Sequence, residues 1–198
     1  MVVDMSLREK KAAKKKEEIL RSASLVIARN GYKNATMEDI AAELLMTKGS
    51  LYYYFKNKEE LLYKCHELIL SCAMERLEEL FLENLSAREK MQRAIKVHLD
   101  IVIQEKEVFN LIGKPEQIFS EENIVKVFQK RDEYAGIFDR IIDEGVARGE
   151  FIIDQKKMAR MMILGAANWV QVWYSSEGQY GKDELEEIYA KYLLKILL

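Results

Sequence analysis

The chain has 198 residues, 49% of them hydrophobic and 32% charged, and a formal net charge of −2. This length accommodates one large or two small domains with a real core. No run of about 18 uncharged apolar residues is available to span a membrane, and the first residues lack the apolar centre of a signal peptide, so we expect a cytoplasmic protein.

The charge is distributed unevenly along the chain. Residues 1–64 carry 13 Lys and Arg against 9 Asp and Glu, a net charge of +4, whereas residues 65–198 carry 18 against 24, a net charge of −6. A basic N-terminal third on an acidic remainder indicates that only the first third meets a polyanion. A lysine run near the N-terminus is either a solvated helix face or a phosphate-binding arm. It comprises Lys10, Lys11, Lys14, Lys15 and Lys16.

Helical periodicity runs through nearly the whole chain, which has one proline, nine glycines and no β-alternating segment. We therefore predict an all-α protein of about nine helices. They cover residues 8–30, short segments starting at 36 and 47, residues 57–82, a segment starting at 86, and residues 107–112, 121–148, 155–174 and 183–198. The start and stop signals are Thr36 with Asp39, Thr47, Asn57 with Glu60, Ser86 with Glu89, and Asp154 as N-terminal caps, and Gly31 and Gly149 as C-terminal residues.

The stretch from Thr36 to Lys58, TMEDIAAELLMTKGSLYYYFKNK, is the most informative in the chain. A short helix with a buried face is followed by a break at residues 45–47 and by a second short helix. The outer face of this second helix, with Lys48, Ser50 and three tyrosines, is too polar and too aromatic for ordinary core. Two short helices joined by a three- or four-residue turn form the helix-turn-helix unit, whose second helix enters the DNA major groove.

Several residues of this second helix have side chains suited to DNA. Gly49 would let the backbone approach closely, Ser50 can bond a base or a phosphate, and Tyr52 and Tyr53 offer hydroxyls to phosphates or ring edges to a thymine methyl group. Lys58 begins the next helix, where a cation and a helix N-terminus can share one phosphate. The alternative for any single tyrosine is packing beneath the helix.

The segment NGYKNATMEDIAAELLMTKGSLYYYFKNKEELL resembles the DNA-binding domain of the tetracycline-repressor (TetR) family, over about residues 15–64. The aromatic residue after the glycine, the Thr-x-x-x-Ile-Ala core and the KGSLYYYFKNK run carry the resemblance. Leu45 departs from the pattern, because many relatives have glycine at this turn, and leucine at a positive φ would be slightly strained. By position, the resemblance implies DNA contacts from Thr36, Thr47, Lys48, Ser50, Tyr52, Tyr53 and Lys58.

The family resemblance also implies an architecture. It implies an all-helical homodimer with a three-helix DNA-binding head and a C-terminal body that binds a small molecule and dimerises through its last two helices. We accordingly expect a helix-turn-helix domain at residues 1–57 and a ligand-binding and dimerisation domain at residues 58–198. The helices near 155–174 and 183–198 would form the dimer, since both have broad apolar faces. On the first of them this face comprises Ala159, Met162, Ile163, Ala166 and Val170.

The C-terminal part is similar to the TetR subgroup that includes regulators of fatty-acid and sterol catabolism, with the Asn-Trp-x-x-x-Trp-Tyr run at residues 168–174 as its best marker. That subgroup commonly senses acyl-CoA thioesters, which need an apolar tunnel and cations for phosphates. The expected effector-binding residues are Phe109, Phe128, Arg131, Tyr134, Phe138, Met162, Trp169 and Trp173, and the alternative for each aromatic or Met is core packing. Further candidate cations are Lys126, Lys130, Arg140 and Arg148, unless they pair with Asp132, Glu133 and Asp143.

Enzymatic chemistry has little support. The chain has two histidines and shows no Ser-His-Asp set, phosphate-binding glycine loop or metal-ligand spacing, so we expect no catalytic residue and no cofactor other than the effector. His98 is expected to be a core or pocket histidine. Cys65 and Cys72 lie about 10 Å apart on one helix, too far for a disulfide, and are expected to be buried thiols, with a metal site that includes His66 as the alternative.

These inferences predict a TetR-family repressor that a small-molecule effector releases from a palindromic operator. A long-chain acyl-CoA is the best candidate for the effector, and genes of fatty-acid metabolism are the expected targets. An alternative is a regulator of an efflux or stress gene that responds to another hydrophobic ligand. Distant alternatives are a helical enzyme and a non-specific architectural DNA-binding protein.

Overall fold

A computed structural model describes residues 6–198, except for the side chains of residues 7–10 and 28. This part of the chain contains nine α-helices and two short 3-10 helices, and no β-strand, so the predicted all-α fold is confirmed. The α-helices are α1 (Leu7–Asn30), α2 (Met37–Glu43), α3 (Lys48–Tyr54), α4 (Lys58–Glu79), α5 (Ala87–Gln104), α6 (Lys106–Ile112), α7 (Glu121–Ala147), α8 (Lys156–Trp173) and α9 (Lys182–Leu194). The 3-10 helices are η1 (Pro115–Gln117) and η2 (Lys195–Leu197). Over the described range, every helix is too short or too polar to cross a membrane.

The chain divides into two compact units. The first contains Met1–Leu68 and Asn110–Val127, and the second contains Ile69–Phe109 and Phe128–Leu198. Helices α4 and α7 both begin in the first unit and continue into the second. The expected division between residues 57 and 58 falls inside the first unit, because the first turns of α4 and the segment before α7 join the N-terminal helices.

Local hydrogen bonds account for several helix starts. The Thr36 hydroxyl accepts from the backbone N–H of Asp39 at 3.1 Å, and the Asp39 carboxylate accepts from the Thr36 N–H at 2.9 Å, which completes the predicted capping box of α2. Thr47 caps α3 by accepting from the Ser50 N–H at 3.2 Å, and a second capping box begins α5 at Ser86. These hydrogen bonds confirm the predicted caps. They could be predicted because each capping residue and its partner lie within three residues of each other at the helix start.

One predicted helix cap is wrong, and two predicted C-terminal glycines are confirmed. Asp154 does not cap α8, whose N-cap is Gln155 and has no side-chain hydrogen bond. Gly31 and Gly149 have φ values of 76° and 68° after α1 and α7, as predicted for C-terminal glycines. Leu45 adopts the same left-handed conformation after α2, with a φ of 52°.

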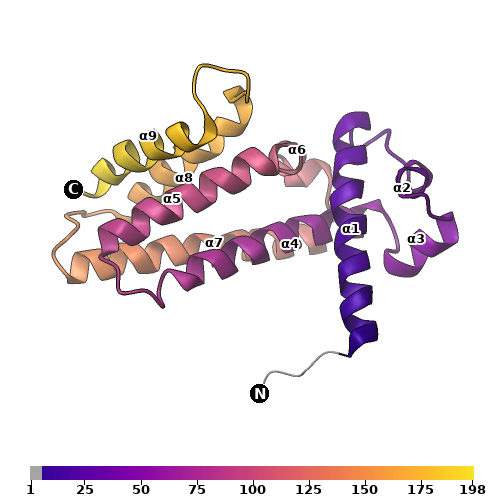
Figure 1. The fold of residues 1–198 in the computed structure, drawn as a ribbon, viewed down its shortest axis with the longest axis horizontal. Coiled ribbons are helices and arrows are strands. Elements are labelled where there is room, and N and C mark those ends of the chain that lie inside the picture. The colour runs from indigo at the N-terminus through magenta and orange to yellow at the C-terminus, as the bar shows by residue number, and fades with distance from the viewer. Residues whose placement is uncertain (1–5) are drawn as a thin grey trace. The chain divides into compact units, whose positions relative to one another are not determined.

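The N-terminal helices of the first unit bury apolar side chains. Figure 1 shows α2 and α3 beside α1, and α1 contributes Ile19 and Ile27 to the interior while α3 contributes Leu51. The buried thiol of Cys65 on α4 donates to the Leu20 carbonyl of α1 at 3.1 Å.

The second cysteine differs from the first. Cys72 is exposed, so the expectation of two buried thiols is wrong for this residue. The two residues are seven positions apart on α4, but Cys65 belongs to the first unit and Cys72 to the second, so different neighbours surround them.

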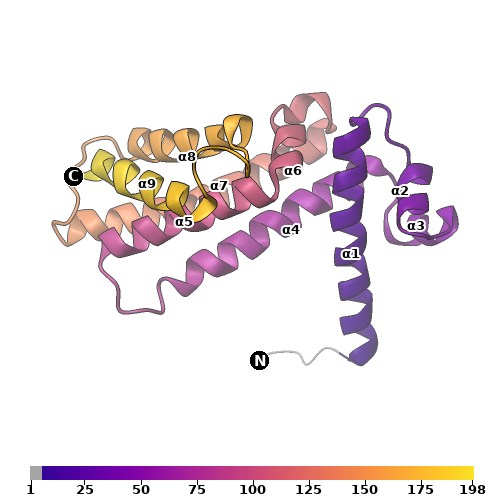
Figure 2. The same ribbon diagram turned by 45° about the horizontal axis from the view of Figure 1, so that its top comes forward.

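Helix α5 is the centre of the second unit. Figures 1 and 2 show α8 and α9 running beside it, and both helices pack directly on it. The buried residues of α5 include Met91, Ile95, Leu99 and Val102 along one face and Asp100 on another. Burial on both of these faces is what a central helix requires.

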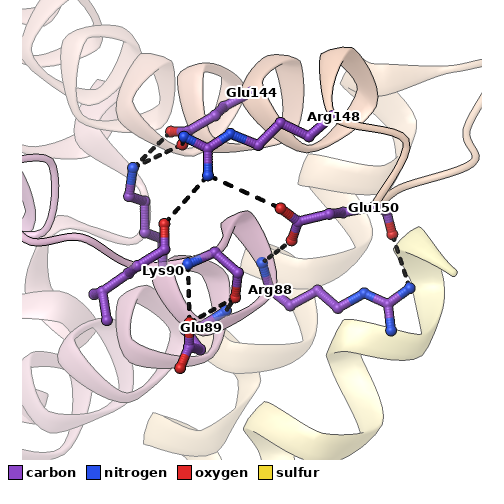
Figure 3. Close-up of polar contacts among 8 residues, drawn as sticks. Arg88, Glu89, Lys90, Glu144, Arg148 and Glu150 are labelled. Atoms are coloured by element: carbon purple, nitrogen blue, oxygen red, sulfur yellow. Dashed lines mark hydrogen bonds and ion pairs between the residues drawn. The ribbon is translucent and has the colours of Figure 1, made fainter.

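Polar side chains tie the first turn of α5 to the end of α7, as Figure 3 shows. The Lys90 ammonium, whose side chain is only 6% exposed, donates to both carboxylate oxygens of Glu144 at 2.8 Å. Arg148 pairs with the same carboxylate at 2.8 Å, and Arg88 donates from its backbone N–H and its guanidinium to Glu150, each at 3.1 Å. Because removal of either partner of a buried pair leaves an uncompensated charge, loss of Lys90 or Glu144 alone should destabilise the protein.

Candidate nucleic-acid interface and effector-binding residues

Helix α3 separates a buried apolar face from an exposed aromatic face. Leu51 is fully buried and Phe55, the C-cap residue, is nearly so. Tyr53 is 83% exposed, Tyr52 is also exposed, and Tyr54 is half-buried with its ring edge-on to Tyr53 at a centroid distance of 5.2 Å. Two of the three tyrosines therefore lie outward on the helix, where DNA could reach them.

Gly49 lies in the first turn of α3 and is exposed. A Cβ atom added at this position would meet no atom within 4 Å. Glycine costs about 1 kcal/mol relative to alanine inside a helix. No packing requirement within the described chain explains that cost, so the residue is suited to close approach by an external partner.

The two threonines and the serine of the expected DNA interface take part in helix caps. Thr36 donates its hydroxyl proton to the Asp39 carboxylate at 2.7 Å, and its N–H binds the same group. These two bonds from Thr36 lower the pKa of Asp39. Because both donors of Thr36 are in use, it offers no proton to a phosphate in this conformation.

Thr47 and Ser50 retain one donor between them. Their hydroxyl oxygens lie 2.8 Å apart, and Thr47 also accepts from the Ser50 N–H. One of the two hydroxyl protons bridges the pair, and the other remains for an external acceptor. This pair is exposed at the N-terminus of α3.

Lys48 pairs with Glu38 at the start of α2, and its ammonium lies 5.7 Å from the centroid of the Tyr52 ring. The hydrogen bond between these charges lowers the pKa of Glu38 and raises that of Lys48. Both side chains are exposed, so solvent screens the pair and the ammonium can turn toward a phosphate at little cost.

Lys58 has a different environment from the one that its position suggested. Its ammonium donates to the backbone carbonyls of Tyr32 and, at 2.6 Å, of Ala35, and lies 4.4 Å from the centroid of the Tyr32 ring. Burial lowers the pKa of Lys58. The cation therefore binds the connection between α1 and α2 in this conformation and would have to turn away from it to meet a phosphate.

Sequence reasoning missed the neighbouring Glu59. One oxygen of its carboxylate accepts three hydrogen bonds, from the Ser120 N–H at 2.8 Å, the Ser120 hydroxyl at 2.6 Å and the Asn123 amide at 2.7 Å. The bond from the Ser120 hydroxyl is the main reason that the pKa of Glu59 is lowered. Ser120 before two glutamates is a recognisable helix start, but no local pattern indicates a partner 61 residues away.

The residues expected to bind an effector fall into separate groups. Tyr134 and Phe138 on α7 are buried, with ring centroids 5.6 Å apart, and pack against His98 of α5. The Tyr134 hydroxyl lies 2.8 Å from His98 Nδ1, and the Asn168 side-chain oxygen lies 3.1 Å from His98 Nε2. With the Asn168 oxygen as acceptor, His98 must donate from Nε2 and accept at Nδ1 from the tyrosine.

This polar group lies inside an apolar core. Burial lowers the pKa of His98 to about 4, so the imidazole is neutral at pH 7, and burial also raises the pKa of Tyr134. The expectation that His98 is a core or pocket histidine agrees with its burial and its two hydrogen-bond partners.

Phe128 and Arg131 form a second group, with the guanidinium 5.9 Å from the ring centroid of an exposed phenylalanine. Phe109 on α6 is half-buried against the core of the second unit. The other candidate cations lie on α7 or directly after it and have carboxylate partners. The pairs are Lys126 with Glu122, Lys130 with Glu133, Arg140 with Glu78, and Arg148 with Glu144. Of the partners named from the sequence, Glu133 is confirmed, whereas Asp143 pairs with Lys156.

Three further expected effector contacts lie on the exposed face of α8. Met162 and Trp169 on α8 are 62% and 63% exposed, and Trp173 is also exposed, with its ring stacked on Tyr189 of α9 at 6.5 Å. Met162 and Trp169 belong to a stripe of exposed residues at helical spacing along α8. The stripe comprises Met158, Met161, Met162, Gly165, Trp169 and Val172. Aromatic character alone could not distinguish this stripe from the buried face of the same helix.

The apolar face expected to form a dimer therefore needs correction. Ala159, Ile163 and Val170 are buried within their own chain, whereas Met162 is exposed. The stripe just described is the face of α8 that remains available for a second copy. An exposed contiguous apolar patch of this kind is typical of a protein interaction site.

A buried carboxylate, Asp100 on α5, was also missed. It accepts from Arg76 on α4 at 2.7 Å and from Lys182 on α9 and Gln104. Burial raises the pKa of Asp100, but the hydrogen bonds from Lys182 and Arg76 outweigh it and lower the pKa. The group holds three helices of the second unit together, and its members are far apart in sequence.

Comparisons with known proteins identify the chain. A family model described as the tetracyclin repressor-like C-terminal domain matches residues 84–197, and one described as bacterial regulatory proteins of the tetR family matches residues 19–65. The fatty acid metabolism regulator protein of Bacillus subtilis is 29% identical over 82% of this chain and 85% of its own length. The transcriptional repressor KstR2 of Mycolicibacterium smegmatis is 27% identical over 92% and 90%.

A solved structure extends the likeness to three dimensions. FadR from Bacillus subtilis in complex with stearoyl-CoA is 27% identical, with a TM-score of 0.78, over 92% of this chain and 99% of its own. The helix-turn-helix at α2 and α3 and both family matches agree with one another. The chain therefore belongs to the TetR family of DNA-binding transcriptional repressors.

Proposed function

We propose that the protein is a dimeric repressor that leaves a palindromic operator when it binds a long-chain acyl-CoA. One observation carries the proposal, the likeness over nearly the whole chain to a regulator solved with stearoyl-CoA. Genes of fatty-acid metabolism are the proposed targets. Operator binding requires the compartment that holds the chromosome, which in a bacterium is the cytoplasm, and the proposal includes no enzymatic activity and no cofactor other than the effector.

The proposed DNA interface is the exposed side of α3. Lys48, Gly49, Ser50, Tyr52 and Tyr53 would face the major groove, and Thr47 would support Ser50. Tyrosine hydroxyls and the lysine suit phosphates, while the free hydroxyl proton of the threonine–serine pair suits a base or phosphate acceptor.

Thr36 and Lys58 are weaker members of the proposed interface. Their donors bind Asp39 and the connection between α1 and α2, respectively. They would contribute only if those bonds open when DNA binds.

The proposed effector site lies in the second unit, near the buried part of α7. Sites for apolar ligands combine an apolar lining with a few polar anchors. Tyr134, His98 and Asn168 supply such polar groups within the core, and Phe138 supplies an aromatic wall. Arg131 beside Phe128 would serve a phosphate of the nucleotide part.

The proposed mechanism is a shift of equilibrium between two states. The effector binds best to a form in which α4 and α7 no longer hold the two recognition helices at the spacing of the operator half-sites. By linkage, the operator must then weaken effector binding by the same factor as the effector weakens operator binding.

The effector part is tested by titrating the DNA-free protein with stearoyl-CoA, coenzyme A and stearate in a calorimeter. We expect stearoyl-CoA to bind much more tightly than coenzyme A, because coenzyme A lacks the apolar acyl chain. Absence of heat and of thermal stabilisation with stearoyl-CoA would remove this effector. Screening of other hydrophobic ligands would then test the alternative of an efflux or stress-gene regulator.

A further inference from the structure

Two consecutive side chains at the start of α4 hold two different segments of the first unit. Lys58 binds the connection between α1 and α2, and Glu59 binds the start of α7. Neighbouring residues on a helix point about 100° apart, so one turn can hold segments on two sides.

The contact of Glu59 is specific for the helix end. Ser120 is the residue before α7, and its carbonyl accepts the helical hydrogen bond from the Ile124 N–H at 2.9 Å. Glu59 binds both the N–H and the hydroxyl of Ser120, and Asn123 completes the set from the first turn. A carboxylate at a helix N-terminus is also favoured by the helix dipole. The first turn of α7 is thus fixed to α4 by charge-assisted bonds.

The contact of Lys58 leads to the recognition helix. Its ammonium binds the carbonyl of Ala35, which directly precedes Thr36, the N-cap residue of α2. Helix α2 is joined to α3 by a turn of four residues, Leu44 to Thr47. The position of the start of α4 therefore fixes where α2 begins and hence where α3 lies within the first unit.

We propose that Lys58 and Glu59 are positioning residues that transmit the place of the α7 N-terminus to α2 and α3 and so set operator affinity. Helix α7 continues from this contact into the second unit, where it carries Tyr134 and Phe138. The direction of the effect rests on the proposed function, because the effector-free form is taken as the form that binds the operator. Loss of the Glu59 contact then weakens operator binding.

The charge of Glu59 allows its positioning role to be distinguished from a simple electrostatic effect on DNA binding. Removal of a carboxylate from a DNA-binding unit ordinarily strengthens its attraction to phosphates. Glu59→Ala is expected to weaken operator binding despite that gain. Asn123→Ala removes one of the three hydrogen bonds to Glu59, the one from the first turn of α7, without a change in charge.

The test is a double-mutant cycle on operator affinity, with a duplex selected by the wild-type protein from a random library and fluorescence anisotropy at fixed salt. We expect Glu59→Ala and Asn123→Ala each to weaken binding about fivefold or more, and the double variant to lose no more than the worse single variant. Glu122→Ala is the matched control. It removes an exposed carboxylate from the first turn of α7, next to Asn123, and the ion-pair partner of this carboxylate is Lys126. The variant should change the operator dissociation constant less than about twofold.

A second readout separates positioning from simple stabilisation. Hydrogen exchange of residues 121–127 should slow when the wild-type protein binds the operator duplex and should respond less in Glu59→Ala. Variants that melt at lower temperature but keep the wild-type dissociation constant would overturn the proposal, as would additive losses in the double variant. Neither measurement uses an effector, so both can be interpreted even if the protein does not bind acyl-CoA.

Discussion

Leu45 is the residue whose backbone departs most from its preference. It lies just after α2 with a φ of 52°, and the N–H groups of Met46 and Leu45 bind the carbonyls of Ala41 and Ala42 at 2.8 and 3.0 Å. This pattern is a Schellman motif, which normally has glycine at the left-handed position. The leucine side chain is 96% exposed, so packing does not offset the strain.

Replacement of this leucine by glycine should stabilise the protein. Leu45→Gly should increase the free energy of unfolding by about 1 kcal/mol, because glycine adopts positive φ without the Cβ clash. Leu45→Ala, which keeps the Cβ, should leave it nearly unchanged. Urea unfolding followed by circular dichroism measures both, and equal midpoints for the glycine and alanine variants would contradict the strain.

His98 should make the protein sensitive to mild acid. Its imidazole stays neutral in the fold down to a pKa of about 4, whereas it protonates near 6.5 when unfolded. The unfolded state therefore binds more protons below pH 6.5, and stability falls as pH decreases from 6.5 to about 4. Between pH 7 and pH 5 the loss from this residue should be about 2 kcal/mol.

The variant His98→Gln isolates this effect. Carboxylates titrate in both proteins and cancel in the difference between them. Urea midpoints at pH 7 and pH 5, at one protein concentration, should converge for wild type and variant as the pH falls. A constant gap between the two proteins would show that His98 does not titrate as its burial requires.

Single residues show what local sequence predicts and what it misses. The strain at Leu45 was predictable, because the turn and its preference for glycine involve only neighbouring positions. The partners of Lys58 and Glu59 lie 26 and 61 residues away, and no local pattern encodes them. Their contacts depend on which segments the tertiary fold brings together.

At the scale of elements, α3 contains a glycine that internal packing does not require. Gly49→Ala should stabilise the helix by up to about 1 kcal/mol, since alanine has the higher helix propensity. It should also weaken operator binding about tenfold, because the added methyl group would meet DNA. Thermal unfolding and anisotropy test the two effects separately.

Gly136 on α7 offers the matched control for this change. A Cβ added there also meets no atom within 4 Å, so Gly136→Ala should stabilise its helix without altering operator affinity. If Gly49→Ala binds the operator as tightly as the wild-type protein, the backbone at this position does not approach DNA.

The sequence predicts where several helices begin, but it does not predict which face of a helix is buried. The starts at Thr36, Thr47 and Ser86 were predictable from caps, but the start of α8 was not, because Gln155 makes no capping bond. Apolar residues occupy two faces of α8, and periodicity could not tell which one packs on α5. The expected effector residue Trp169 consequently lies on the exposed face.

At the scale of the whole molecule, the exposed stripe of α8 should form the dimer interface. Met162→Lys would place a charge within that apolar surface and should raise the dimer dissociation constant about tenfold or more, with a parallel loss of operator affinity. Sedimentation measures the first effect. Leu82→Lys, which adds the same charge at an exposed leucine between α4 and α5, is the control and should remain dimeric.

The overall organisation was predictable to different degrees. The all-α class and the helix-turn-helix followed from periodicity, caps and one family motif. The association of residues 110–127 with the N-terminal helices did not, because it joins segments separated by the whole of α4 and α5. The eight effector residues expected from their apolar, aromatic or basic character likewise proved to belong to separate groups.

Whether an acyl-CoA releases the repressor is tested most directly by operator affinity with and without stearoyl-CoA, measured by anisotropy on a labelled operator duplex. Saturating stearoyl-CoA should weaken operator binding, and saturating operator should weaken stearoyl-CoA binding by the same factor. An operator dissociation constant that stays the same at saturating stearoyl-CoA would contradict this mechanism.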